Sequence, residues 1–136
     1  MAECIFCNIV EGRIPSAEIL SDETAYAFLD INPLAEGHVL LIPRTHYETI
    51  DEMPGDEASR VMKHVPSLVK AVQAATDCDG VNVLQNNGRT AHQLIPHVHV
   101  HIIPRYEQDE FHFNWPAESY PEGRMEEVQN KIRKHF

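Results

Sequence analysis

Residues 97–105 read HVHVHIIPR, and this stretch decides the fold. Three histidines occupy alternate positions, separated by valines and followed by isoleucines. Successive side chains on a β-strand point to opposite faces, so His97, His99 and His101 would share one face. The alternating apolar residues would then face the core, and we expect the strand to end at Pro104. The histidine face is either a functional site or exposed surface, and the threefold repetition favours a site.

The length of such a strand limits what the histidines can do together. At roughly 3.3 Å per residue, His97 and His101 would lie about 13 Å apart along a straight strand. Zinc binds imidazole nitrogen at only about 2.0–2.1 Å, so one ion cannot bind both residues. The three histidines are therefore expected to divide between different roles.

Composition sets the class of protein. A chain of 136 residues with 43% hydrophobic residues is expected to form one domain with its own core. The net charge of −10 argues against nucleic acid or an anionic membrane as partner, because phosphate groups require Lys and Arg. We find no apolar stretch approaching about 18 residues and no signal-peptide pattern. Three cysteines without a secretion signal favour a reduced, cytoplasmic protein.

The hydrophobic pattern predicts an α+β domain with an antiparallel sheet of about five strands. The spacing of Val61, Val65, Leu68 and Val72 predicts a central helix, and Pro66 predicts a break in it near Val65. The other expected elements are a helical turn over 4–12, a hairpin over 17–30, strands over 38–43, 80–86 and 97–103, and a C-terminal helix over 122–134.

With these elements in place, the chain resembles the histidine triad (HIT) superfamily of nucleotide hydrolases and transferases. Three blocks support the resemblance in the family's order: CIFCNIVEGRIPSAEI (4–19), FLDINPLAEGHVLLIPRTH (28–46) and NNGRTAHQLIPHVHVHIIPR (86–105). The first block looks like the start of small, Hint-like bacterial members. The resemblance implies a single HIT domain over residues 1–136, with a central and a C-terminal helix, that works as a homodimer.

The resemblance also implies a mechanism. His99 would attack the α-phosphorus of a nucleotide and form a nucleotidyl-imidazole, which water then hydrolyses. A neutral imidazole suits this role because its pKa of about 6.5 leaves a ring lone pair available at pH 7. A backbone carbonyl near His97 would hold the second ring nitrogen of His99. His101 would contact phosphate oxygens and assist the leaving group, and His38 would be a further histidine of the phosphate site.

The same resemblance implies the nucleotide contacts. Asp30 would accept hydrogen bonds from the ribose hydroxyls, which predicts a preference for ribonucleotides. Asn86 would contact phosphate or ribose, and Gln93 is the family's glutamine beside the triad. The apolar slot for a purine base would be formed by Phe6, Ile9, Phe28 and Ile31. Residues of this type also pack in cores, and one side chain can do both.

Two positions depart from the family's pattern. His92 stands where relatives usually carry Gly, and a positive φ there would strain a histidine, although histidine tolerates it better than most residues. Leu94 stands where relatives carry Ser, Thr or Glu. A hydroxyl at that position would help to protonate the leaving group, and leucine cannot. The departure leaves the nucleophile intact and the preferred leaving group open.

The N-terminal Cys-x-x-Cys pair predicts a metal site. Cys4 and Cys7 alone are half of a tetrahedral zinc site, which is a weak signal. In HIT members with this pair, the implied remaining ligands are His46 and His97. Four protein ligands form a closed, structural zinc site that would fix the N-terminal turn to the histidine strand. The alternative is a pair of reduced cysteines without metal, as expected for Cys78.

These observations lead to one main hypothesis and several alternatives. The main hypothesis is a hydrolase that cleaves a purine ribonucleotide conjugate of AMP or GMP type, such as a phosphoramidate, at the α-phosphate. Within the enzymes, the alternatives are a dinucleoside polyphosphate hydrolase and a nucleotidyl transferase. Outside them, the chain could be a nucleotide-binding regulatory protein with weak or no catalysis, or a zinc module for protein contacts.

Overall fold

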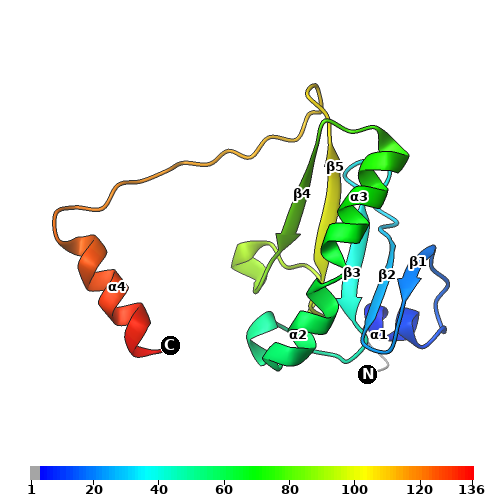
Figure 1. The fold of residues 1–136 in the computed structure, drawn as a ribbon, viewed down its shortest axis with the longest axis horizontal. Coiled ribbons are helices and arrows are strands. Elements are labelled where there is room, and N and C mark those ends of the chain that lie inside the picture. The colour runs from blue at the N-terminus through cyan, green and yellow to red at the C-terminus, as the bar shows by residue number, and fades with distance from the viewer. Residues whose placement is uncertain (1–3) are drawn as a thin grey trace.

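A computed structural model describes residues 4–136 as five strands and four α-helices (Figure 1). The strands are β1 (Glu18–Ser21), β2 (Ala25–Leu29), β3 (Val39–Pro43), β4 (Gly80–Gln85) and β5 (Val100–Arg105). The helices are α1 (Ile5–Val10), α2 (Gly55–Met62), α3 (Val65–Thr76) and α4 (Arg124–Lys134), and 3₁₀ turns span Ile50–Glu52 and Arg89–Ala91. The strands form one antiparallel sheet in the order β1-β2-β3-β5-β4, which confirms the predicted α+β class.

One face of the sheet is covered by α2 and α3 (Figure 1). The predicted break near Val65 is confirmed, because α2 ends at Met62 and α3 begins at Val65. Pro66 lies in the first turn of α3, where a backbone N–H would make no hydrogen bond within the helix, so its absence costs nothing. The apolar cluster between sheet and helices contains Ala25, Ala27, Val39, Leu41, Val61, Leu68, Val72, Val100 and Ile102. Val100 and Ile102 of β5 therefore face the core, as the alternation predicts.

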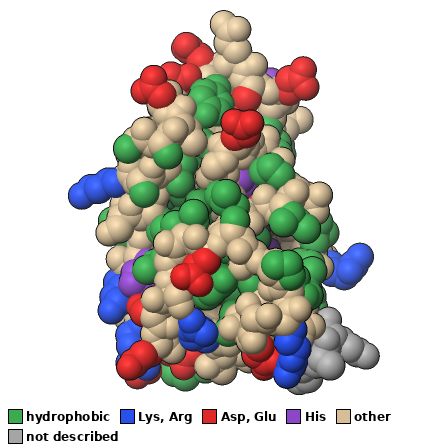
Figure 2. Space-filling model, turned by 90° about the vertical axis from the view of Figure 1, so that its right-hand side faces the viewer, with side chains coloured by type: hydrophobic (Ala, Val, Ile, Leu, Met, Phe, Trp, Pro, Cys, Tyr) green, Lys and Arg blue, Asp and Glu red, His purple; other side chains and the backbone are tan. Residues whose placement is uncertain are grey.

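The opposite face of the sheet is covered only in part, by α1. A second apolar cluster lies there, made of Cys4, Phe6, Cys7, Ile9, Tyr26, Phe28, Leu40 and Ile42. It packs the short helix against β2 and β3 and leaves the β5 side of the same face open. Figure 2 shows apolar side chains gathered across the middle of one side of the molecule, with histidine visible between them.

The histidine strand differs from its predicted bounds. It begins at Val100 rather than His97, and it continues through Pro104 to Arg105. Residues 97–99 leave the ladder because β3 ends at Pro43, which has no N–H to donate. The Val98 N–H instead donates to the Tyr47 carbonyl, 2.8 Å away. Pro104 is tolerated because only β4 accompanies β5 at that point.

The predicted C-terminal helix forms, but it stands apart from the sheet. An extended segment leads away after β5 and carries α4 at its end (Figure 1). No residue of α4 is buried, and Trp115 in the extended segment is 80% exposed. Within the described residues, no helix has the length and apolar character needed to span a membrane.

Candidate functional site

His99 is held in one tautomer by the backbone. Its Nδ1 lies 2.7 Å from the His97 carbonyl oxygen, and a carbonyl can only accept a hydrogen bond. Nδ1 therefore carries the proton and Nε2 keeps a free lone pair. The Phe6 ring packs edge-on against the imidazole, with centroids 5.3 Å apart. Burial lowers the pKa of His99 despite that hydrogen bond, so the ring is neutral at pH 7.

His101 is held in the opposite tautomer through His38. The Leu34 N–H donates to His38 Nδ1 at 3.0 Å, so the proton of neutral His38 is on Nε2. That Nε2–H points to His101 Nδ1, 2.9 Å away, which leaves the proton of His101 on Nε2. Burial lowers the pKa of both residues, to about 4 for His101. We call the hydrogen bonds from Leu34 through His38 to His101 the relay. The relay ends in an N–H donor on His101, next to the nucleophilic lone pair of His99.

Asp30 completes this group at the end of β2. One carboxylate oxygen accepts the Asn32 N–H at 2.9 Å, and the other lies 3.7 Å from His38 Nε2. One ligand atom each from Asp30, His38 and His101 lies within 4.8 Å of the others, a spacing that a metal ion could bridge. The relay places a proton on His38 Nε2, however, so that nitrogen offers no lone pair to a metal.

A cavity of about 470 Å³ brings the predicted nucleotide residues together, a size usual for small-ligand sites. It is open to solvent, and Ile31 lies at its rim with 81% of its surface exposed. The predicted residues that line it are Phe6, Ile9, Phe28, Asp30, Ile31, His38, Asn86, His99 and His101. Nine predicted site residues from separate parts of the chain therefore line one cavity.

Gln93 has a different setting from the one expected. It is buried and does not line the cavity. Its side-chain oxygen accepts the Gly88 N–H at 2.7 Å, and its amide donates to the carbonyls of Glu48 and Ile95. These bonds occupy the polar atoms of the side chain, so Gln93 fixes the loop that precedes the histidines. His92 in that loop adopts the left-handed conformation, with φ of 72°, which glycine accommodates with least strain.

Cys4, Cys7, His46 and His97 converge on one point, away from the cavity. His97 is fully buried, and its Nε2–H donates to the Pro43 carbonyl at 2.9 Å, which leaves the Nδ1 lone pair facing the thiols. His97 Nδ1 lies 3.4 and 3.7 Å from the two sulfurs and 3.2 Å from His46 Nδ1. His46 Nδ1 lies 3.5 Å from the Cys7 sulfur.

These distances fit zinc. Tetrahedral zinc with usual bond lengths separates its nitrogen and sulfur ligands by about 3.3–3.8 Å, close to the observed distances of 3.2 to 3.7 Å. Burial raises the pKa of the Cys7 thiol to about 11, and the neighbouring Cys4 adds to the rise. A bound cation would reverse that effect and stabilise the thiolates. The donor set and its spacing therefore suit a zinc ion bound by all four residues.

Four further residues line the cavity without having been among the predicted nucleotide contacts: Leu84, Leu94, Ile103 and Phe111. Leu84 faces the site because β4 pairs with β5 and sets Leu84 opposite His101. The sequence places Ile103 on the histidine face by alternation, but the strand order that brings in Leu84 depends on long-range contacts. Phe111 lies beyond the family's blocks.

Comparisons with known proteins agree with this geometry. The HIT domain family profile matches residues 11–108. Adenosine 5′-monophosphoramidase HNT1 of Candida albicans is 38% identical over 140 residues, covering 99% of this chain and 92% of that protein. A HIT family structure from Bacillus subtilis superposes with a TM-score of 0.94 at 38% identity, covering 98% and 97% of the two chains. A zinc-bound histidine triad protein from Mycobacterium smegmatis has a TM-score of 0.76 at 28% identity, covering 99% of each chain.

Proposed function

Because the chain belongs to the HIT domain family, we propose that it hydrolyses purine ribonucleotide conjugates at the α-phosphate through a nucleotidyl intermediate on His99. The observation that supports this best is the hydrogen bond from His99 Nδ1–H to the His97 carbonyl. It directs the free Nε2 lone pair of a neutral imidazole into the cavity. The likeness to a fungal adenosine 5′-monophosphoramidase favours adenosine phosphoramidates as the substrate class.

The first step forms a bond between His99 Nε2 and the α-phosphorus. The bond from phosphorus to the leaving nitrogen breaks, and its electron pair stays on that nitrogen. The nitrogen takes a proton from water at the open mouth of the cavity. The adduct is an imidazolium, because His99 keeps its Nδ1 proton on the His97 carbonyl.

In the second step water attacks the phosphorus and releases the nucleoside monophosphate. The phosphorus–nitrogen bond to His99 breaks, and its electron pair returns to Nε2. The attacking water releases one proton to solvent, which balances the proton taken up in the first step. Nucleophilic catalysis of this kind replaces one difficult displacement by two easier ones.

His101 and His38 would stabilise the charge that builds up on phosphate oxygens in both steps. The Nε2–H of His101 is a preorganised donor, because the relay from Leu34 through His38 fixes its tautomer. The pKa of His101, lowered by burial to about 4, keeps it neutral at pH 7. It therefore acts as a hydrogen-bond donor rather than as an acid that gives up its proton.

Asp30 and the apolar slot would hold the nucleoside. One Asp30 oxygen is already engaged by the Asn32 N–H, and the other is free to accept from the ribose hydroxyls. Phe6 and Phe28 meet edge to face, with centroids 5.6 Å apart, and form a rigid wall for a planar base. Asn86 at the other side of the cavity would contact phosphate or ribose.

Zinc bound by Cys4, Cys7, His46 and His97 would be structural. It would join α1, the loop after β3 and the segment before β5, and so hold the His97 carbonyl against His99. Thiolates persist in reducing conditions, which supports the cytoplasm as the compartment. The zinc-bound histidine triad relative supports zinc as the metal.

We also propose that the protein works as a homodimer. The sheet has β4 as an edge strand, and an unpaired edge requires cover in a native protein. Val83 on that strand is exposed, as are Met125, Ile132 and Phe136 along the detached C-terminal region. A second copy could cover both surfaces. Sedimentation equilibrium would give twice the mass of one chain, and a monomer at micromolar concentration would contradict the proposal.

Intact-protein mass spectrometry after rapid mixing with adenosine 5′-phosphoramidate tests the mechanism. We expect an added AMP mass in the wild type and none in His99→Ala, which should also lose roughly 10⁴-fold or more in kcat. His135→Ala is the matched control, because this histidine is exposed on the end of the detached helix. AMP binding without adduct or turnover of phosphoramidate or diadenosine polyphosphate would favour a regulatory protein instead.

A further inference from the structure

We propose that Cys4 and Cys7 form a redox-sensitive switch, in which oxidation of the pair to a disulfide releases zinc and weakens nucleotide binding through Phe6. The inference rests on the proposed function, because the zinc site and the nucleotide cavity both belong to it. It adds a covalent modification and its consequence. The oxidant is a peroxide, which is small enough to reach sulfurs that are 9% and 7% exposed.

The two sulfurs are placed to form a disulfide. Cys4 caps the start of α1 and Cys7 lies in its first turn, and the Cys4 sulfur accepts the Cys7 N–H at 3.4 Å. The ligand atoms of the zinc cluster, both sulfurs included, lie within 4.8 Å of one another. Disulfide oxidoreductases use the same Cys-x-x-Cys spacing to form and break a disulfide reversibly. Rotation of the two side chains is therefore enough to join them.

The oxidation needs only the two cysteines and the peroxide. One zinc-bound thiolate attacks a peroxide oxygen, the O–O bond breaks, a sulfenic acid forms and hydroxide leaves. The second thiolate attacks the sulfenic sulfur, the S–O bond breaks, the S–S bond forms and a second hydroxide leaves. Two protons from solvent convert the hydroxides to water, and the sulfurs have given two electrons to the peroxide. Only His46 and His97 of the four-ligand set then remain to hold zinc.

Phe6 lies between the two cysteines and connects them to the nucleotide cavity. Its ring packs edge-on against His97 and His99, with centroids 5.8 and 5.3 Å apart, and against Phe28 at 5.6 Å. The side chain is buried and lines the cavity. A change in how α1 is held therefore reaches a ring that contacts both a zinc ligand and the proposed nucleophile.

The attachment of α1 depends on the cysteines. The helix has six residues, which is too few for a helix to be stable alone. Backbone hydrogen bonds at its ends are local, such as those from Asn8 N–H to the Cys4 carbonyl and from Arg13 N–H to the Asn8 carbonyl. The second apolar cluster and the contacts of both sulfurs with His97, at 3.4 and 3.7 Å, attach it to the sheet. Oxidation removes the second of these and leaves only apolar packing.

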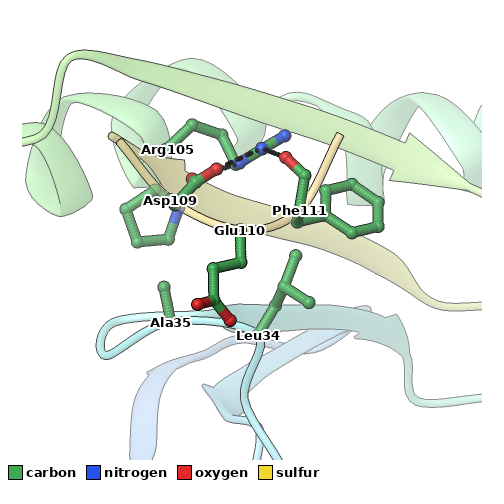
Figure 3. Close-up of a pocket in the computed structure, with 7 residues that line it drawn as sticks. Leu34, Ala35, Arg105, Asp109, Glu110 and Phe111 are labelled. Carbon is green, nitrogen blue, oxygen red and sulfur yellow. Dashed lines mark hydrogen bonds and ion pairs between the residues drawn. The ribbon is translucent and has the colours of Figure 1, made fainter. Parts of the chain in front are cut away.

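A second aromatic wall of the cavity is held in a way that oxidation does not affect. Arg105 donates to the Phe111 carbonyl and stacks over the Phe111 ring, 4.7 Å from the centroid (Figure 3). Two hydrogen bonds of 2.7–2.8 Å to the Asp109 carboxylate fix Arg105 in turn. No sulfur takes part in these contacts. The expected effect of peroxide is therefore confined to the Phe6 wall.

Peroxide titration of the zinc-loaded protein tests the switch. The tryptic peptide 1–13 contains Cys4 and Cys7 but not Cys78, so a loss of about 2 Da from it identifies the disulfide. A zinc-sensitive dye should report about one released ion for each disulfide. Calorimetry should show AMP binding weakened by about fivefold in the oxidised protein, within the range of one aromatic contact. A dithiol reductant with zinc should restore the affinity, and zinc alone should not.

Three controls identify the cause of the weaker binding. Cys78→Ser should respond like the wild type, since Cys78 lies outside the pair. Reduced protein stripped with a chelator should also bind AMP more weakly, and zinc alone should restore it. Phe6→Leu should bind AMP more weakly from the start and change by less than about twofold on oxidation, because the route through the ring is already lost. Circular dichroism should show the fold retained, since the first apolar cluster lies on the other face of the sheet.

The outcomes separate the switch from the proposed function. Zinc retained after peptide 1–13 is oxidised, full AMP affinity in the oxidised protein, or an equal loss of affinity in Phe6→Leu would each overturn the switch while the hydrolase stands. Peroxide that oxidises Cys78 alone would also overturn it. A reduced protein that takes up no zinc would overturn the zinc site and the switch. A reduced, zinc-loaded protein that binds no AMP would overturn the proposed function, and the switch with it.

Discussion

Two clusters of metal-capable side chains each take one histidine from residues 97–101, and the histidines in the two clusters have opposite kinds of backbone partner. Cys4, Cys7, His46 and His97 form one, and Asp30, His38 and His101 form the other. In the first, a backbone carbonyl accepts from His97 Nε2–H and leaves a lone pair facing the thiols. In the second, a backbone N–H donates to His38 Nδ1 and leaves a proton facing His101.

The two clusters show that the backbone group bonded to one ring nitrogen of a histidine decides whether the other ring nitrogen carries a lone pair or a proton. A carbonyl that accepts from one ring nitrogen leaves a lone pair on the other, which can bind a metal or attack an electrophile, and an N–H that donates to one ring nitrogen leaves a proton on the other. Both clusters contain two histidines, and the ligand atoms within each cluster lie within 4.8 Å of one another. His99 lies between them, with its own carbonyl partner and its lone pair directed into the cavity. The start of β5 therefore brings the candidate zinc site and the proposed catalytic histidine together.

Removing the thiols should have the largest effect on stability. Cys4→Ser with Cys7→Ser should cost on the order of 5 kcal/mol of unfolding free energy, less than the roughly 10–16 kcal/mol that zinc contributes to zinc fingers, because two apolar clusters remain. Urea denaturation with zinc present measures the loss, and Cys78→Ser is the matched control. Equal stability of the double variant and the control would contradict the contrast between the two clusters, because the first cluster would then hold no metal.

Replacing His38 tests the second cluster through activity. His38→Ala removes the partner that fixes the tautomer of His101, and kcat should fall roughly 100-fold, as expected when a positioned hydrogen-bonding group is lost. His38→Gln, which keeps a side-chain donor, should recover part of the loss. Both variants should bind one zinc ion per chain, like the wild type. Loss of zinc in His38→Ala would mean that the two clusters are not independent.

Cobalt titration compares the clusters directly. One equivalent of Co²⁺ per chain should give the intense visible bands of a tetrahedral site with thiolate ligands, and a second equivalent should add nothing. The expectation follows from the proton on His38 Nε2, which leaves the second cluster without a complete donor set. A second bound ion that inhibits turnover would show that Asp30, His38 and His101 rearrange into a metal site.

Much of this arrangement is predictable from the sequence, and the reasons differ between the parts. Alternation and proline positions predict the sheet, the broken helix and the C-terminal helix. The resemblance to a family predicts the ligand set and the cavity residues. The tautomers are not predictable, because they depend on backbone groups such as the Pro43 carbonyl and the Leu34 N–H. Gln93 shows the same limit, since its partners are loop carbonyls that no side-chain pattern reveals.

The start of β5 illustrates why local pattern and structure differ. HVHVH alternates perfectly, but a strand also needs a neighbour to pair with. By the register of β3 and β5, the partner position of Val98 is Pro43, which has no N–H to donate, and the Val98 N–H bonds to the Tyr47 carbonyl in the following loop instead. The interruption lets the His97 carbonyl turn toward His99 rather than bond to β3. The predicted strand bounds are thus wrong at residues 97–99, which include the proposed nucleophile His99.

The smallest expected effect is on the pH dependence of stability. It tests the protonation state of His101 in the second cluster. Burial lowers the pKa of His101 to about 4, below its ordinary value of 6.5. The unfolded chain therefore binds the proton first, so the contribution of neutral His101 is complete above pH 6.5 and is lost as the pH falls toward 4. We expect about 2 kcal/mol from this residue, allowing for partial solvent screening.

Urea denaturation of wild type and His101→Gln at pH 7 and at pH 4.5 measures that contribution. His97 in the first cluster also has a pKa lowered by burial to about 4, so low pH weakens both clusters. The first cluster is unchanged in His101→Gln, and its share cancels when the two proteins are compared at equal zinc content. The variant should lose less stability than the wild type on acidification. Equal losses would mean that His101 is already protonated, and the relay from Leu34 could not then fix its tautomer.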